Sequence, residues 1–142
     1  MKITRASDYA IRVILFLALQ PGDKYFMRGE LSEKCSIPDS FLGKLLQFLV
    51  KADMLYSERG KKGGFKLKKE PKDISLYDII VSVEGDIQIN ECLTDNSFCS
   101  ESFHCSIHNA LNTIRNNMIN DLKRYTVADL MNEQNHKPDI SN

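Results

Sequence analysis

Two short helical patterns separated by a tight turn constrain the fold more than any other feature of this sequence. Residues 28–35 predict one helix and residues 39–52 predict the next. Ser36 and Asp39 have the spacing of a capping box, which predicts a helix start within this turn. A buried stripe on the second helix is predicted to contain Phe41, Leu42, Leu45, Phe48 and Leu49. Two helices joined in this way are typical of a helix-turn-helix.

The opposite face of the second helix is polar. Four residues recur along it at spacings of four, three and four: Ser40, Lys44, Gln47 and Lys51. Side chains of these types contact base edges and phosphates in the DNA major groove. Gly43 lies beside this face, and a glycine inside a helix costs about 1 kcal/mol relative to alanine. The close approach of another molecule would justify that cost.

A basic hairpin is predicted directly after these helices. Residues 55–59 and 65–69 are strand-like, and the glycine-rich segment 60–64 predicts a turn between them. Three cationic residues suited to contacting flanking phosphates and the minor groove lie in this hairpin: Arg59, Lys61 and Lys62. A fourth, Arg28, begins the helix predicted at 28–35. The order of elements predicts a winged helix-turn-helix.

The charge distribution supports a polyanionic partner. Residues 1–72 hold 15 Lys and Arg against 8 Asp and Glu, a net charge of +7. Residues 73–142 hold 4 against 11, a net charge of −7. We therefore expect residues 1–72 to form a DNA-binding domain for double-stranded DNA.

The remaining chain predicts a linker, a dimerisation helix and a tail. Residues 73–105 read as a linker helix followed by a cysteine-bearing sensor loop, and residues 132–142 as a disordered tail. The segment 106–131 is predicted to hold a long helix and a short terminal one. The long helix carries apolar residues at spacings close to a coiled-coil seam: Ile107, Leu111, Ile114, Met118, Leu122 and Tyr125. The predicted fold class is therefore mainly α with a small β-hairpin, a winged helix-turn-helix plus a long C-terminal dimerisation helix.

Three cysteines fall within fourteen residues of the predicted sensor loop: Cys92, Cys99 and Cys105. Their polar surroundings argue against buried structural thiols. Their spacings of seven and six residues differ from the close pairs of structural zinc sites. The pattern favours an iron–sulfur cluster, with zinc and a thiol redox switch as alternatives. Cys35, at the end of a helix, is interpreted as a small buried residue.

These motifs together resemble the Rrf-two (Rrf2) family of bacterial transcription regulators. The resemblance rests on the opening Lys2-Ile3-Thr4 through Asp8-Tyr9-Ala10, on Ser40-Phe41-Leu42, on the glycines of the hairpin, on the three cysteines, and on the closing segment 126–130. The family implies a homodimer held by the long helix and a cluster bound by the cysteines, with a fourth ligand that differs between branches.

Two residues match the fourth ligand of different branches. Asp8 matches the aspartate that nitric-oxide-sensing members supply from the other subunit, and it is also placed to pair with Arg12. His108 matches the histidine of cluster-assembly regulators. We slightly favour Asp8, and with it a 4Fe–4S rather than a 2Fe–2S cluster. The implied effector is nitric oxide, oxygen or iron–sulfur status.

We expect a cytoplasmic regulator rather than an enzyme. No apolar run has the length of a membrane span, and no glycine-rich phosphate loop or catalytic triad stands out. The rival hypotheses are a cluster-free winged-helix regulator switched by thiol oxidation and a basic interaction module. The operator, the target genes, and activation versus repression do not follow from the residues.

Overall fold

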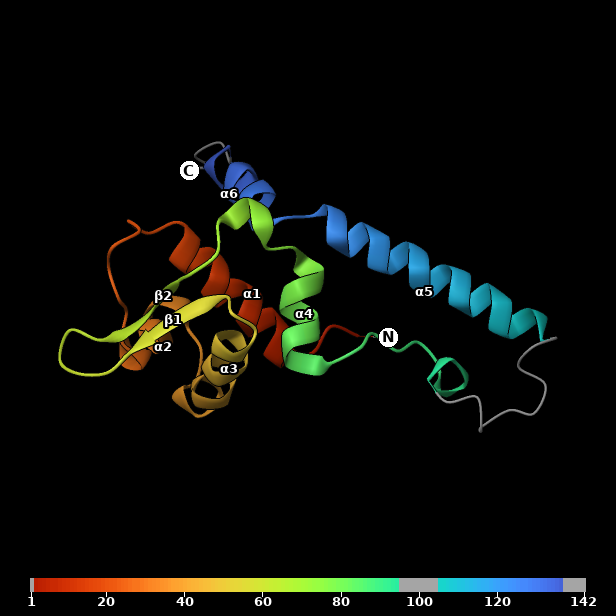
Figure 1. Cartoon of the computed structure of the whole chain (residues 1–142), viewed down its shortest axis with the longest axis horizontal. Coiled ribbons are helices and arrows are strands. Elements are labelled where there is room, and N and C mark those ends of the chain that lie inside the picture. The colour runs from red at the N-terminus through yellow and green to blue at the C-terminus, as the bar shows by residue number, and fades with distance from the viewer. Residues whose placement is uncertain (1, 95–104, 137–142) are drawn as a thin grey trace, which may run out of the picture.

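The computed structural model describes residues 2–94 and 105–136 and confirms the predicted fold class. The elements in chain order are α1 (Arg5–Ala18), α2 (Arg28–Cys35), α3 (Asp39–Lys51), β1 (Leu55–Glu58), β2 (Gly64–Leu67), η1 (Pro71–Asp73), α4 (Leu76–Glu84), η2 (Glu91–Leu93), α5 (Ser106–Arg124) and α6 (Val127–Asn135). Helices α1 to α4 gather around one core beside the two-stranded hairpin (Figure 1). No helix among these described residues has the length and hydropathy needed to cross a membrane.

Helix α1 forms the centre of the core because its apolar residues recur with helical spacing. Ala10, Val13 and Ile14 are completely buried, and α1 contacts α2, α3, α4, α6 and β2. Helix α3 supplies the facing layer through Leu42, Leu45, Leu46 and Leu49. Burial of side chains of this size contributes about 1.5–3 kcal/mol each. The core therefore fixes α3 with its polar face turned outward.

The hairpin is attached to the helices by a third extended segment. Strands β1 and β2 pair antiparallel, with Leu55 opposite Leu67. Phe26 then exchanges two backbone hydrogen bonds with Phe65, of 2.9 and 2.8 Å. Gly64 makes this approach possible, because its φ is +128° and a Cβ there would lie 2.3 Å from the carbonyl oxygen of Phe26. The backbone that follows the predicted turn is therefore hydrogen-bonded both to β1 and to the segment before α2.

The chain leaves the core through α4 and returns to it at α6. Ser75 and Thr126 form an isolated antiparallel bridge, in which the Val127 amide donates to the Ile74 carbonyl at 2.8 Å. Both residues are N-caps within capping boxes, Ser75 with Asp78 and Thr126 with Asp129. The starts of α4 and α6 are therefore held together, and α5 is anchored to the body at its C-terminal end.

Helix α5 projects away from the rest of the molecule (Figure 1). It spans 19 residues, none of which is buried. The exposed fractions of Ile107, Ile114 and Tyr125 are 66%, 54% and 52%. Arg115 attaches this helix to the segment after α4, because its Nε donates to the Ile87 carbonyl at 2.6 Å. The predicted seam is therefore only partly covered, because Leu111, Met118 and Leu122 are half-buried while its other three residues are exposed.

Several local predictions were wrong. Residues 132–135 continue helix α6 instead of beginning a disordered tail, and Phe48 is half-buried rather than buried. Ser36 ends α2 in the left-handed conformation, with a φ of 54°, while Pro38 is the N-cap of α3, so Ser36 and Asp39 form no capping box. Phe41 is 42% exposed rather than buried, because its ring packs edge-to-face on Tyr9, with centroids 5.4 Å apart, at the margin of the core.

Candidate functional site

The polar face predicted on α3 is exposed as a continuous strip. Ser40, Lys44, Gln47 and Lys51 are all exposed, and Gly43 is half-buried beside them. The ammonium group of Lys44 lies 5.6 Å from the centroid of the Phe48 ring, which supports the side chain along the helix. A helix that presents such a strip fits the width of the DNA major groove.

A groove of about 400 Å³ runs between α3 and the hairpin. Its lining joins α2, α3, β1 and β2 and comprises Arg28, Gly43, Leu46, Gln47, Val50, Lys51, Ser57 and Phe65. Four predicted DNA-binding residues thus meet in one groove, although Arg28 lies more than ten positions from the others in sequence. Ser57 belongs to the same groove, and the sequence analysis did not single it out.

The remaining cationic candidates lie on the hairpin. Arg59, Lys61 and Lys62 are exposed, and the hairpin loop extends beyond the core at the end of the molecule opposite η2 (Figure 1). Gly63 is buried beneath the loop, and a Cβ there would lie 2.2 Å from the Glu58 carbonyl oxygen. The exposed side chains of Arg59, Lys61 and Lys62 therefore project from a loop whose backbone is tightly packed at Gly63.

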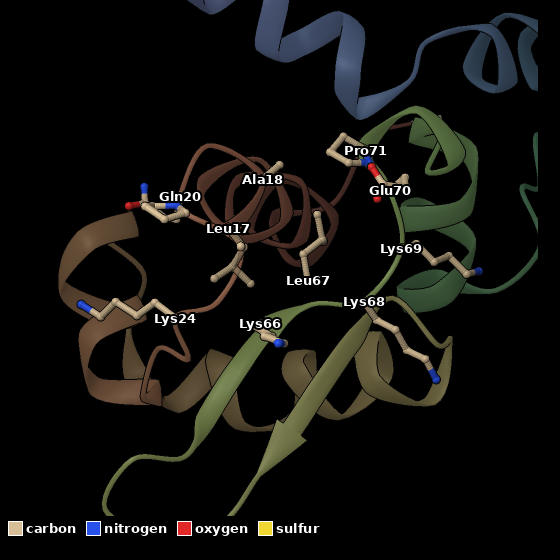
Figure 2. A pocket seen from close by; sticks show the side chains of 12 residues that line it. Leu17, Ala18, Gln20, Lys24, Lys66, Leu67, Lys68, Lys69, Glu70 and Pro71 are labelled. Atoms are coloured by element: carbon tan, nitrogen blue, oxygen red, sulfur yellow. The ribbon is translucent and has the colours of Figure 1, made fainter.

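A second lysine-rich hollow, of about 250 Å³, lies between the end of α1 and β2 (Figure 2). Three of its lysines have partners: Lys68 pairs with Asp53, Lys24 lies over the Phe26 ring at 4.4 Å, and Lys66 lies over the Tyr25 ring at 5.0 Å. These contacts account for three of the four lysines that line the hollow, and Lys69 is the fourth.

Two of the three predicted sensor cysteines are associated with α5. Cys92 is the middle residue of η2, which packs against α5, and Cys105 is the N-cap of α5. Both thiols are free and half-buried. Cys99 lies outside the described residues. Among the described residues no group of three potential metal-binding side chains is assembled.

His108 occupies the first turn of α5. Its Nδ1 atom is buried and has no hydrogen-bond partner within the described part of the chain. An N-cap residue and the third helical residue after it lie side by side at the start of a helix, which places His108 next to Cys105. A buried imidazole nitrogen without a partner is costly unless it binds something. This site therefore has soft and borderline donors suited to iron.

Asp8 lies in the first turn of α1, and Cys35 is the last residue of α2. The Asp8 carboxylate forms an ion pair with Nη2 of Arg12 at 2.9 Å, as predicted, and both side chains are about half exposed. Burial raises the pKa of the Cys35 thiol, and the charge of Arg12 opposes this only in part. Since thiolates are the reactive form, the raised pKa lowers the reactivity of Cys35, which is half-buried rather than buried as interpreted from the sequence.

A polar clasp joins the end of α4 to the start of α1. The Glu84 carboxylate accepts hydrogen bonds from the backbone amide of Thr4 at 3.3 Å, from the Thr4 hydroxyl at 2.6 Å, and from the Ser7 hydroxyl. Ser7 is completely buried. Glu84 immediately precedes the segment that leads to Cys92, so the clasp links this segment to the helix that carries Asp8. Sequence patterns could not reveal it, because the partners are about 80 residues apart.

Comparison with known proteins decides the family. The Rrf2 family model, described as iron-dependent transcriptional regulator, matches residues 3–133. The chain belongs to the Rrf2 family. YffB of Lactococcus lactis, an HTH-type transcriptional regulator by name, is 33% identical over 94% of this chain and 88% of its own length. NsrR of Bacillus subtilis is 32% identical over 92% and 90% of the two chains.

The fold of this Rrf2 protein also matches solved structures. CymR, the global cysteine regulator of B. subtilis, is 26% identical with a TM-score of 0.73, over 94% of this chain and 98% of that one. The matched relatives are transcriptional regulators, so this Rrf2 chain is a DNA-binding transcription regulator with a winged helix-turn-helix, as the sequence predicted.

Proposed function

We propose that this Rrf2 regulator senses its signal through an iron–sulfur cluster held by Cys92, Cys99 and Cys105, and that the cluster controls binding to a double-stranded DNA operator in the cytoplasm. The observation that carries the proposal is the buried Nδ1 of His108, which has no hydrogen-bond partner among the described residues and lies in the first turn of the helix that Cys105 caps. The contact between η2 and α5 supports it by bringing Cys92 to the same helix. Thiolates with one further nitrogen or oxygen ligand are a donor set that binds such clusters.

Two residues compete for the fourth position. His108 supports a ligand set complete within one chain, because its ring nitrogen lacks another partner. Asp8 would act from the second subunit and would have to exchange its 2.9 Å contact with Arg12 for iron. The resemblance to nitric-oxide-sensing members of the family favours Asp8, with a 4Fe–4S cluster, whereas His108 would suit a 2Fe–2S cluster.

A bound cluster supplies iron that reacts with nitric oxide or oxygen. The contacts of Glu84, which link the cysteine-bearing segment to α1, indicate which elements would move. Cys92 is joined to the core through the segment that follows Glu84, and Glu84 holds the first turn of α1. A change in ligand positions at η2 would therefore act on α1, against which α3 packs. Repositioning α3 by a small rotation would alter how two half-sites are matched.

The second subunit is proposed to cover α5. A 19-residue helix without one buried residue, carrying Ile107, Ile114 and Tyr125 more than half exposed, leaves an apolar stripe in water. The heptad-like spacing of this stripe fits a second copy of the same helix. A homodimer also supplies the two recognition helices that a palindromic operator needs.

Anaerobic purification tests the sensor. We expect coloured protein that contains iron and acid-labile sulfide, with operator affinity that changes when the metal is removed by a chelator. Mössbauer and absorbance spectra of Asp8→Ala and His108→Ala identify the fourth ligand, and Asn109→Ala in the same turn of α5 serves as the control. Colourless, iron-free wild-type protein, or operator affinity indifferent to metal removal, would contradict the proposal and leave thiol oxidation as the alternative.

A further inference from the structure

Arg28 lies at the junction of the two helices of the helix-turn-helix. It is the first residue of α2, and its Nε lies 2.9 Å from the Oδ1 of Asp39, the first residue of α3. The two side chains are 54% and 55% exposed. The ion pair therefore brings a cation from α2 to the solvent-facing side of α3.

Gly43 provides the room for this guanidinium. A Cβ built at Gly43 would lie 3.3 Å from Nη1 of Arg28, and no other atom lies within 4 Å. The guanidinium thus extends over the second turn of α3, at the one position of that turn without a side chain. Gly43 has no positive φ that would require glycine. The space that the Arg28 guanidinium needs therefore explains why a glycine lies inside this helix.

The guanidinium faces the groove that holds the other candidates for DNA contact. Arg28 and Gly43 line it together with Gln47, Lys51 and Ser57. Because Asp39 engages Nε, the two terminal nitrogens of Arg28 keep their N–H groups for a ligand. A planar pair of N–H donors matches O6 and N7 of guanine in the major groove, a geometry that lysine cannot reproduce.

We propose that Arg28 recognises a guanine in each operator half-site, that Asp39 is a positioning residue that orients the guanidinium, and that Gly43 is the position that admits it. The inference rests on DNA binding by α3 but not on the iron–sulfur cluster. It assigns one base of the operator to α2 rather than to the recognition helix itself.

The test is selection of duplexes from a randomised pool by the full-length wild-type chain, followed by affinity measurements on the selected operator and on single-base variants. In the wild type, replacing the recognised guanine should weaken binding by about 5- to 150-fold. Arg28→Ala and Arg28→Lys should both lose this discrimination at that position only. Gly43→Gln should lose it by displacing the guanidinium.

Matched variants separate base recognition from charge. Lys34→Ala removes one cation from the same helix outside the groove and should leave the preferred sequence unchanged. Asp39→Asn should reduce guanine discrimination. If Asp39 acted only by repelling the DNA phosphates, the same substitution would instead strengthen binding to all sequences. If Arg28→Lys keeps the wild-type preference, or if Arg28→Ala weakens all duplexes equally, Arg28 contacts phosphate and the proposal is overturned. A wild-type chain that selects no sequence overturns the DNA interface and this inference together.

Discussion

Replacing Glu84 by alanine should destabilise the protein through the polar clasp between α4 and α1. The carboxylate accepts three hydrogen bonds, two from Thr4 and one from Ser7. Thr4 is also the N-cap of α1, where its hydroxyl accepts from the Ser7 amide at 3.3 Å. Glu84→Ala therefore removes the acceptor from two hydroxyl groups and frees the start of α1.

The magnitude follows from the burial of Ser7. Its side chain is completely buried, so its hydroxyl would lose its acceptor, and water could replace this acceptor only through the space that the exposed Glu84 carboxylate vacates. An orphaned buried donor costs about 1–3 kcal/mol, and we expect Glu84→Ala to lose this much free energy of unfolding. Glu84→Gln keeps an acceptor oxygen but not its charge and should lose roughly half as much, because charge-assisted hydrogen bonds are about twice as strong.

The assay is urea unfolding followed by circular dichroism at fixed protomer concentration, since a dimer's stability depends on concentration. Partial burial raises the pKa of Glu84, but the hydrogen bonds from Ser7 and Thr4 outweigh this effect and hold the pKa below its ordinary value of 4.5. A depressed pKa contributes stability above the ordinary value, and this stability is lost as the pH falls through the folded-state pKa. The difference between wild type and Glu84→Gln should be constant near neutral pH and shrink in acid below 4.5.

A double-mutant cycle with Ser7→Ala provides the decisive comparison. If the two groups interact as described, Ser7→Ala removes the orphaned hydroxyl, and the double variant should be more stable than the sum of the two losses predicts. Strictly additive losses, or an unfolding midpoint for Glu84→Ala equal to that of the wild type, would refute the reasoning.

Three further predictions follow from other parts of the structure. Ile114→Glu places a charge in the proposed α5 seam and should shift the protein to monomer in sedimentation velocity, whereas Asn116→Glu on the other side of the helix should not. Gly64→Ala should lower the free energy of unfolding by more than about 1 kcal/mol, because a Cβ cannot fit 2.3 Å from the Phe26 carbonyl oxygen; an unchanged urea midpoint would contradict this packing. Since burial raises its pKa, Cys35 in cluster-free protein should react with iodoacetamide more slowly than in urea-unfolded chain, as measured by peptide mass mapping.

Much of the candidate site could be predicted from local patterns. The spacing of Ser40, Lys44, Gln47 and Lys51 predicted an exposed strip, and all four are exposed. The basic hairpin was placed correctly to within a residue or two at the strand ends. These features depend on helical and strand periodicity, which is a property of neighbouring residues and can be read from one sequence. The roles of these residues on DNA remain predictions.

The sequence by itself determined the helices, the hairpin, the separation of charge and the cluster of cysteines, because each follows from residues close together along the chain. Only the tertiary structure decided what the turn residues do: Ser36 ends a helix, and Asp39 holds Arg28 instead of capping. The pairing of Phe26 with Phe65, the bridge between Ser75 and Thr126, and the Glu84 clasp also appear only after folding. Their partners lie tens of residues apart, and a hydrogen bond between distant residues leaves no periodic trace in the sequence. Such a hydrogen bond forms because burial of the core brings the two segments together, and the polar groups there that lose contact with water pair with one another.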